Sequence, residues 1–336
     1  MKILNGKKLL VTGATGFVGG HLTRRLLKEG YDVSILVRTT SDPAEVDELK
    51  RLGAKLHYGD VTDRESVFEA VKGKDIIFHI AALFREAKFP DQVYWNVNVK
   101  GTENVLDAAE EFGCQRVIHC STIGVHSHIE DSPADENEAY RPDDVYQVSK
   151  CEGEKLVKER FAAGRIKGTI IRPAMIWGDG DRRILKLFRG VARRRFPIIG
   201  NGQTWTHWIY VHDLVNSFIL AAEKDEAIGQ TYIIAGNEPH TLQEVVEAVA
   251  EAAGVKPLPI KIPAAPVQAL GSLVEFVCRP FGIEPPLHRR RVDFFTKNRW
   301  FDTRKAESEL GFHATHDFRT EVKKIYNWYD QQGWLN

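Results

Sequence analysis

The first half of the chain alternates short apolar runs with stretches of helical periodicity. Runs rich in β-branched residues predict strands at Lys8–Thr12, Val33–Val37, Lys55–Tyr58, Ile76–Ile80, Val117–Cys120 and Thr169–Arg172. Helical spacing lies between them, over Gly16–Glu29, Arg64–Val71, Asn98–Phe112 and Tyr146–Ala163. Most of these strands lack polar alternation, which is typical of a parallel sheet covered on both faces. The pattern therefore predicts an α/β fold with a doubly wound parallel sheet, a Rossmann fold.

After residue 172 the alternation becomes less regular. We expect a basic helix at Arg182–Arg195, strands at Trp208–Val211 and Gln230–Ala235, and helices at Asp213–Glu223, Thr241–Ala253, Val267–Cys278, Thr303–Leu310 and Asp317–Gln332. Thr241, with Glu244 three residues later, has the spacing of a capping box. The chain is therefore expected to form a Rossmann domain from residues 1–172 and 207–240. Residues 173–206 and 241–336 would form a smaller, mostly helical substrate-binding lobe, interleaved with it.

Composition and charge narrow the class of protein. The 336 residues carry 46 basic and 46 acidic side chains, so nothing global points to nucleic acid or an anionic membrane. No apolar run is long enough for a membrane span, and the N-terminus does not read as a secretory signal. The four cysteines show no Cys-x-x-Cys spacing, which favours reduced thiols in a cytoplasmic protein. His126 and His128 could form a metal pair, but no third ligand is evident and we expect no metal.

A glycine turn joins the first predicted strand to the first predicted helix. In LLVTGATGFVGGHL, Gly13 permits the tight turn, Gly16 lets the backbone approach a pyrophosphate, and Gly19 allows close helix–sheet packing. The helix N-terminus then offers unpaired N–H groups and a positive dipole end to that pyrophosphate. The neighbouring residues expected to contact the cofactor are Thr15, Phe17 and Val18.

The end of the second predicted strand indicates the type of dinucleotide. An NAD site usually has an acidic residue there, whereas an arginine accommodates the 2′-phosphate of NADP. Here Val37 occupies the carboxylate position and Arg38 follows it. We therefore predict a preference for NADP(H), with NAD(H) still possible. Asp60, after the third strand, is expected to bond the adenine amine.

Tyr146 and Lys150 lie four residues apart, so a helix places them on one face. An ammonium near a phenol stabilises the phenolate. Lowering the pKa of a tyrosine from about 10 to about 7 takes roughly 4 kcal/mol. A positive charge about 4 Å away supplies about that much at an effective dielectric of ~20, provided that the pair lies in a cleft. Ser121 and Thr122, at the end of a predicted strand, are candidate donors to a substrate carbonyl.

Several motifs together resemble one family. The segments TGATGFVG, HYGDV, HIAA, NVNVKGT, HCSTIGV, YQVSK and RPAMIWG follow the order and spacing of the extended short-chain dehydrogenases/reductases, and the resemblance covers nearly the whole chain. It implies that Tyr146 exchanges a proton with the substrate oxygen and that Lys150 binds the nicotinamide ribose and lowers the tyrosine pKa. Thr122 would orient the carbonyl, with Ser121 as the alternate. The other cofactor contacts expected by resemblance are Val61, Ala81, Ala82, Asn98, Pro173 and Ile176.

The resemblance also bears on the substrate. Nucleotide-sugar enzymes of the family carry an asparagine and an arginine where this chain has Met175 and Thr206. The loss of the arginine removes a charge-assisted phosphate contact. Aromatic residues suggest an apolar pocket instead, although core packing explains any one of them equally well. The substrate contacts that we expect are Phe84, Thr122, Met175, Trp177 and Trp208.

The C-terminal part is similar to the region found in 3β-hydroxysteroid dehydrogenases and related sterol and flavonol reductases. Apolar residues there could form a lid, touch a membrane surface between arginines, or simply pack on the smaller lobe. The lid candidates are Val267, Leu270, Leu273, Val274, Phe276 and Val277, flanked by Arg279 and Arg289–Arg291.

The sequence thus predicts a reductase or dehydrogenase that moves hydride between NADP(H) and a ketone or secondary alcohol on an apolar, steroid- or flavonol-like small molecule. A nucleotide-sugar epimerase or dehydratase with a retained cofactor, and a non-catalytic NADP-sensing regulator, are the alternatives. By family habit the protein would form a homodimer through Asn98–Phe112 and Tyr146–Ala163.

Overall fold

The computed structural model describes residues 3–84, 89–278 and 289–335, and its centre is a seven-stranded sheet. The strands are β1 (Lys8–Thr12), β2 (Asp32–Val37), β3 (Lys55–Tyr58), β4 (Ile76–His79), β5 (Arg116–Cys120), β6 (Gly168–Pro173) and β11 (Thr231–Ile234). Their order is β11-β6-β5-β4-β1-β2-β3, and all six pairings are parallel. The predicted doubly wound sheet is confirmed, with its strands within one or two residues of their expected bounds.

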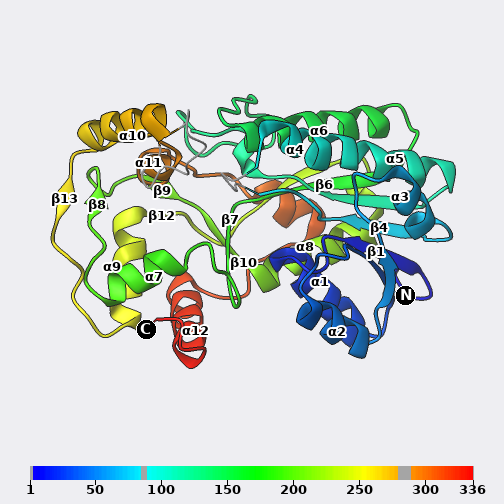
Figure 1. Ribbon diagram of the computed structural model, residues 1–336, viewed down its shortest axis with the longest axis horizontal. Coiled ribbons are helices and arrows are strands. Elements are labelled where there is room, and N and C mark those ends of the chain that lie inside the picture. Colours follow the sequence, from blue (N-terminus) through cyan, green and yellow to red (C-terminus); the bar gives the residue numbers. More distant parts are fainter. Residues whose placement is uncertain (1–2, 85–88, 279–288, 336) are drawn as a thin grey trace.

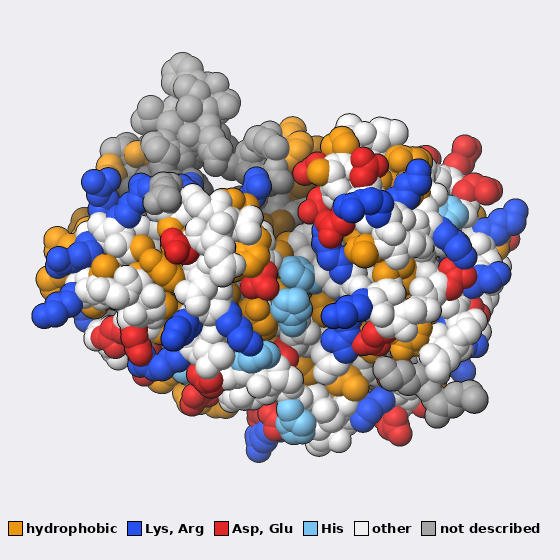
Figure 2. Space-filling view, turned by 90° about the horizontal axis from the view of Figure 1, so that it is seen from below, with side chains coloured by type: hydrophobic (Ala, Val, Ile, Leu, Met, Phe, Trp, Pro, Cys, Tyr) orange, Lys and Arg blue, Asp and Glu red, His pale blue; other side chains and the backbone are white. Residues whose placement is uncertain are grey.

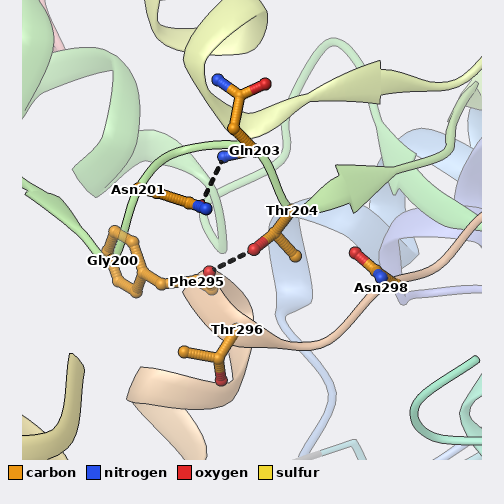
Figure 3. Close-up of a pocket in the computed structure, with 7 residues that line it drawn as sticks. All are labelled: Gly200, Asn201, Gln203, Thr204, Phe295, Thr296 and Asn298. Carbon is orange, nitrogen blue, oxygen red and sulfur yellow. Dashed lines mark hydrogen bonds between the residues drawn. The ribbon is translucent and has the colours of Figure 1, made fainter. Parts of the chain in front are cut away.

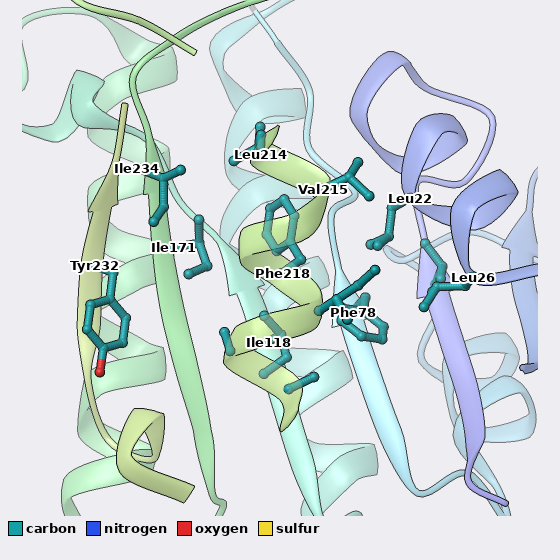
Figure 4. Packing of buried hydrophobic residues seen from close by; sticks show 14 of the residues in the cluster. Leu22, Leu26, Phe78, Ile118, Ile171, Leu214, Val215, Phe218, Tyr232 and Ile234 are labelled. Carbon is teal, nitrogen blue, oxygen red and sulfur yellow. The ribbon is translucent and has the colours of Figure 1, made fainter. Parts of the chain in front are cut away.

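Helices cover both faces of this sheet (Figure 1). One face carries α1 (Phe17–Lys28), α2 (Pro43–Arg51) and α8 (Val211–Glu223), and the other carries α3 (Arg64–Val71), α5 (Gly101–Glu111) and α6 (Val145–Ala162). Neighbouring strand residues alternate between the faces, so Leu9 packs with the first group of helices and Leu10 with the second. Figure 4 shows Phe218 of α8 and Leu22 of α1 against Phe78 of the sheet.

A second apolar cluster lies beside the sheet, at the left of Figure 1. It contains α7 (Leu185–Ala192), α9 (Leu242–Ala252) and α12 (Phe318–Gln331), with the strand pair β7 (Met175–Trp177) and β10 (Trp208–Tyr210). The capping box of Thr241 and Glu244 is present at the start of α9, as predicted. The basic helix expected at residues 182–195 is shorter than predicted, because α7 begins only at Leu185.

Further elements complete the described chain. They are α4 (Asp91–Trp95), the π-helical turns η1 (Asn96–Lys100) and η5 (Ala306–Leu310), the 3-10 turns η2 (Ile123–Val125) and η3 (Asp225–Ala227), strands β8 (Ile198–Ile199), β9 (Trp205–Thr206), β12 (His240–Thr241) and β13 (Lys261–Ile262), and helices α10 (Ala264–Cys278) and α11 (Arg289–Thr296).

Core packing crosses the expected boundaries between the two parts. Phe301 and Phe312, which the sequence analysis placed in the smaller lobe, pack in the cluster of the central sheet, whereas Trp208 and Tyr210 pack in the second cluster. The division of the chain into a Rossmann domain and a substrate lobe stays a prediction.

The described helices include none whose length and apolar character would let it cross a bilayer. In the expected lid helix, Leu270 is exposed, while Val267 and Val274 are partly buried. The side chains of Leu273, Phe276, Val277, Arg279 and Arg289–Arg291 lie outside the described part of the structure.

Candidate functional site

The glycine turn has the geometry that the sequence predicted. Gly13 has φ +74°, and a Cβ there would lie 2.8 Å from the backbone of Ala81, which follows the neighbouring strand β4. A Cβ on Gly19 would lie 2.1 Å from the carbonyl oxygen of Gly13. The turn therefore lies at the carboxyl ends of β1 and β4, the point where the strand order reverses and where such sheets bind ligands.

Helix α1 begins at this turn without a side-chain cap. Gly16 is its N-cap, and the Gly16 N–H bonds the Gly13 carbonyl at 3.0 Å. Within the described chain, the next amides, on Phe17, Val18 and Gly19, have no hydrogen-bond acceptor. These unpaired N–H groups, beside Gly13, Gly16 and Gly19, which have no Cβ, fit the pyrophosphate of a dinucleotide.

The expected adenosine end of the site lies beside this turn. Arg38 is exposed directly after β2, and its amide donates to the Ser41 hydroxyl, to which Thr15 of the glycine turn also donates at 3.3 Å. Asp60 accepts hydrogen bonds from the amide and hydroxyl of Thr62 through one carboxylate oxygen. Val61 is buried against Gly101. The structure thus brings the glycine turn, Arg38 and Asp60 to one edge of the sheet.

Tyr146 and Lys150 project from the first turns of α6, which Asp144 caps by accepting from the Gln147 amide at 2.9 Å. Both side chains are buried, at 8% and 3% exposure. The Lys150 ammonium donates to the carbonyl of Cys120 at the end of β5, 2.7 Å away, and burial lowers its pKa. The Tyr146 ring meets the exposed Phe84 ring edge-on, with centroids 5.1 Å apart. The pair therefore has the low-dielectric setting that its chemistry needs.

Asn98 fixes the loop after β4 to the same helix. Its carboxamide oxygen accepts from the Leu83 amide at 2.8 Å, and its nitrogen donates to the Leu83 carbonyl and to the Ser149 hydroxyl. Ala81 precedes this contact, and its amide donates to Thr12 at 3.2 Å. Ala82 is exposed in this loop. Asn98 therefore links the loop after β4, at the predicted cofactor edge, to α6 by hydrogen bonds.

The two candidate hydroxyls have different surroundings. Ser121 is 3% exposed and donates to the Glu154 carboxylate at 2.5 Å. Thr122 is partly exposed, and its hydroxyl accepts from the Gly124 amide at 3.0 Å, which leaves its proton available to donate. This geometry favours Thr122 over Ser121 as the group that meets a substrate.

A buried ion pair lies behind these hydroxyls. Arg172 of β6 donates to Glu154 of α6 through Nη2 at 2.6 Å, and both side chains are excluded from solvent. The guanidinium of Arg172 and other donors hold the pKa of Glu154 at about 2, against the effect of burial. Tyr140 also donates to Glu154, and His126 bonds Arg172 at 3.0 Å. The network ties β5, β6 and α6 together.

Two of the expected substrate contacts lie in the second core cluster. Trp177 is fully buried and Trp208 is 3% exposed; their rings stack at 4.7 Å in the second core cluster. The Trp177 indole donates to Glu321 at 2.8 Å. Both tryptophans are core residues, the interpretation that the sequence had left open. Met175 and Ile176 are partly buried beside them, and Pro173 is buried at the end of β6.

Two further histidines, His207 and His128, have local hydrogen-bond partners. His207 is buried and bonds the Gly236 carbonyl at 2.9 Å, and burial lowers its pKa to about 4. His128 accepts from the Asn298 amide. Among the described residues, no three His, Cys, Asp or Glu side chains gather as a metal site. Figure 2 shows histidine side chains near the middle of one face. The ring centroids of His21 in α1 and His212 in α8 lie 4.9 Å apart.

A polar hollow of about 470 Å³ lies in the second part of the chain (Figure 3). Its walls are the loop from Gly200 to Thr204 and the end of α11 near Phe295, joined by the hydrogen bond from Thr204 to the Phe295 carbonyl. Asn298 also lines it and accepts from the Trp205 amide. None of the residues proposed for proton or hydride transfer lines this hollow.

Arg183 was missed by the sequence analysis, which assigned it to a basic helix. The structure places it ahead of α7, with its guanidinium 4.9 Å from the Phe17 ring and 5.5 Å from the Phe84 ring. Arg183 follows Arg182 in a segment with helical periodicity, and nothing in the neighbouring sequence indicates that its side chain approaches Phe17 and Phe84.

Comparisons with known proteins agree with this geometry. The model of the NAD dependent epimerase/dehydratase family matches residues 9–235. The chain is 30% identical to a 3beta-hydroxysteroid-dehydrogenase/decarboxylase of Arabidopsis thaliana, over 94% of this chain and 78% of that protein. It is 32% identical to a 3 beta-hydroxysteroid dehydrogenase/Delta 5-->4-isomerase of Mycobacterium tuberculosis, over 95% of this chain and 90% of that protein.

The fold also matches solved structures. The crystal structure of gox2253 superimposes with a TM-score of 0.83 and 31% sequence identity, covering 98% of this chain and all of that one.

Proposed function

Because the chain belongs to the NAD dependent epimerase/dehydratase family, we propose that it transfers hydride between NADP(H) and a ketone or secondary alcohol on an apolar molecule. It is an NAD(P)-dependent oxidoreductase of the extended short-chain dehydrogenase/reductase type. The observation that carries the proposal is the burial of Tyr146 and Lys150 on one face of α6, at the edge of the sheet where the glycine turn lies.

Each side chain has a separate task in this proposal. The bound nicotinamide supplies or accepts the hydride. Tyr146 gives its hydroxyl proton to the substrate oxygen in reduction and takes it back in oxidation. Lys150, whose ammonium donates to the Cys120 carbonyl, would stabilise the phenolate that results and would bond the ribose of the cofactor. Thr122 donates to the same substrate oxygen and holds it within reach of Tyr146.

The pyrophosphate would bind at the unpaired backbone amides of Phe17, Val18 and Gly19. The adenosine would extend toward Asp60 and Arg38. We propose that the exposed Arg38 meets a 2′-phosphate and so favours NADP(H) over NAD(H). Dissociation constants of NADPH and NADH, measured for the wild type and Arg38→Ala, test this; a wild-type preference for NADH would exclude it.

An apolar substrate is supported by two lines of observation. The two relatives described above are named for hydroxysteroids. In addition, Thr206 cannot replace the phosphate-binding arginine of a nucleotide-sugar enzyme, because it is buried, donates to the His240 carbonyl and accepts from the Trp208 indole. The exposed Phe84 next to Tyr146 offers an apolar surface instead. We therefore propose a steroid-like or flavonol-like substrate.

A substrate screen decides between this proposal and the alternatives. Stoichiometric reduction of NADP⁺ by a 3β-hydroxysteroid, or oxidation of NADPH by a 3-ketosteroid or a dihydroflavonol, would support it. Conversion of a UDP- or dTDP-sugar without net change in cofactor would support an epimerase or dehydratase. Tight cofactor binding with no turnover of any class would support the sensing regulator.

Location and assembly stay predictions from the sequence. We propose a cytoplasmic homodimer that pairs α5 and α6 with their copies, and light scattering of the purified protein tests the dimer. A peripheral membrane contact by α10 is tested by sedimentation with phospholipid vesicles.

A further inference from the structure

Arg183 is held in a defined position between the two parts of the chain. Its Nε and Nη2 donate to the two carboxylate oxygens of Asp181, each at 2.8 Å, and Nη2 also donates to the Ile176 carbonyl at 2.9 Å. Asp181 is 1% exposed, and the Tyr329 hydroxyl of α12 donates to its carbonyl. The buried Asp181 carboxylate therefore fixes the orientation of the guanidinium through a bidentate contact. An isolated surface arginine has no such contact.

The oriented guanidinium faces the cofactor edge of the sheet. It lies over the ring of Phe17, the first residue of α1 after the glycine turn, and over the ring of Phe84, which in turn meets Tyr146. It thus stands between the predicted pyrophosphate position and the predicted nicotinamide position. The side chain is 35% exposed, and in the described part of the chain its Nη1 has no hydrogen-bond acceptor.

We propose that Arg183 is a cofactor-binding residue, which donates from Nη1 to the phosphate on the nicotinamide side of the dinucleotide pyrophosphate. The amides of α1 hold the pyrophosphate from the sheet side, and Arg183 closes over it from the opposite side. The cofactor then bridges the central sheet and the second cluster, because Asp181 and Tyr329 attach Arg183 to α12. This inference deepens the proposed function, since it rests on a dinucleotide bound at the glycine turn.

The position of Arg183 suits a phosphate better than a substrate anion. Phe17 carries the first of the unpaired amides of α1, so an anion beside its ring can accept from those N–H groups and from the guanidinium together. An anionic group of a substrate would instead have to lie on the Phe84 side, near Tyr146. The two possibilities differ in which ligand loses affinity when the guanidinium is removed.

The test compares Arg183→Gln with Arg182→Gln, whose guanidinium lies over the Trp334 ring instead. Dissociation constants are measured by calorimetry for three probes: the oxidised dinucleotide, ADP-ribose and AMP, each with the 2′-phosphate if NADP⁺ is preferred. We expect Arg183→Gln to weaken the dinucleotide and ADP-ribose by about tenfold, with AMP unchanged. Arg182→Gln should change none of them, and the tenfold difference should shrink as salt rises.

Three results would overturn the proposal. They are unchanged dinucleotide affinity, equal weakening of all three probes, and a raised KM for an anionic substrate without any change in cofactor affinity. Arg183→Lys keeps the positive charge but loses the bidentate contact, and it serves as a control for misfolding. Its loss of dinucleotide affinity should lie between those of the wild type and Arg183→Gln. These binding measurements need no substrate, so they can be interpreted even if no ketone is turned over. If the wild type bound no dinucleotide at all, the proposed function itself would fail.

Discussion

The hydroxyl of Ser121 donates a hydrogen bond to the carboxylate of Glu154 across 2.5 Å, in a place that solvent does not reach. This contact occupies the first of two adjacent hydroxyls at the end of β5 and leaves Thr122 to face the site. It also links the segment after β5, where Thr122 lies, to the helix that carries Tyr146 and Lys150. The relative position of the three groups therefore depends on the buried ion pair of Glu154 and Arg172.

The two hydroxyls should respond differently to substitution. Thr122→Val removes the proposed donor to the substrate oxygen, and we expect kcat to fall by about 10²-fold, as for the loss of one oxyanion donor. Ser121→Ala should lower kcat far less and cost about 1–2 kcal/mol of stability, because Glu154 loses one of its partners. Steady-state rates and urea unfolding measure both, and the opposite order of the kcat losses would reverse the assignment.

The ion pair itself should be necessary for folding stability. Glu154→Gln leaves Arg172 buried without its counter-charge, which should lower the free energy of unfolding by about 3 kcal/mol or more. Glu152→Gln is the matched control, since Glu152 pairs with Lys155 on the exposed face of α6 and should cost under about 1 kcal/mol. Equal costs for the two variants in denaturant unfolding would show that the buried network is not required.

Two neighbouring glycines of α1 allow a test of the cofactor turn. A Cβ on Gly19 would lie 2.1 Å from the Gly13 carbonyl, so Gly19→Ala must displace the turn, and we expect dinucleotide affinity to fall by about tenfold or more. On Gly20 the nearest atom, at 2.8 Å, is the movable end of the Arg24 side chain. Gly20→Ala should therefore bind nearly as the wild type. Titration of both variants with the cofactor decides, and normal affinity in Gly19→Ala would count against the turn as the pyrophosphate site.

The second cluster should make the stability of the protein fall as the pH rises from about 4.5 to about 8. Burial raises the pKa of Glu321, which accepts from the Trp177 indole, to about 8. Glu321 therefore keeps its proton in the folded state at pH values where the unfolded chain, with the ordinary glutamate pKa of 4.5, has released it. The free energy of unfolding falls as the pH rises from about 4.5 to about 8. Glu321→Gln cannot ionise and should be more stable than the wild type by roughly 1–3 kcal/mol at pH 9, with little difference at pH 5. Thermal unfolding across pH measures this, and parallel curves would contradict it.

The sheet could be predicted because its signal is local. Runs such as Ile76–His79 are apolar on both faces, and they alternate with amphipathic helices. The helix α2 was not foreseen, because its nine residues bury only Val46 and Leu49 and its apolar pattern is correspondingly weak. Its start was nevertheless encoded, with Asp42 as cap and Pro43 at the first position.

The site could be predicted where motif residues share one element. Tyr146 and Lys150 are placed by helix spacing alone, and Gly13 and Gly19 by one turn. Trp177 and Trp208, which we expected at the substrate, are buried in the second core cluster. A sequence does not show whether an aromatic ring packs inward or lines a cavity. Arg183 was missed because its position depends on Asp181, Phe17 and Phe84, and the last two come from distant parts of the chain.

The most direct test of the account is a single-turnover measurement on Tyr146→Phe, saturated with NADPH and mixed with a ketone that the wild type reduces. The phenylalanine keeps the ring contact with Phe84 and lacks only the hydroxyl. The account predicts unchanged cofactor affinity and a rate of NADPH oxidation lower by at least about 10²–10⁴-fold, the range of general acid–base catalysis. A variant that binds NADPH normally and oxidises it at the wild-type rate would contradict the role given to Tyr146.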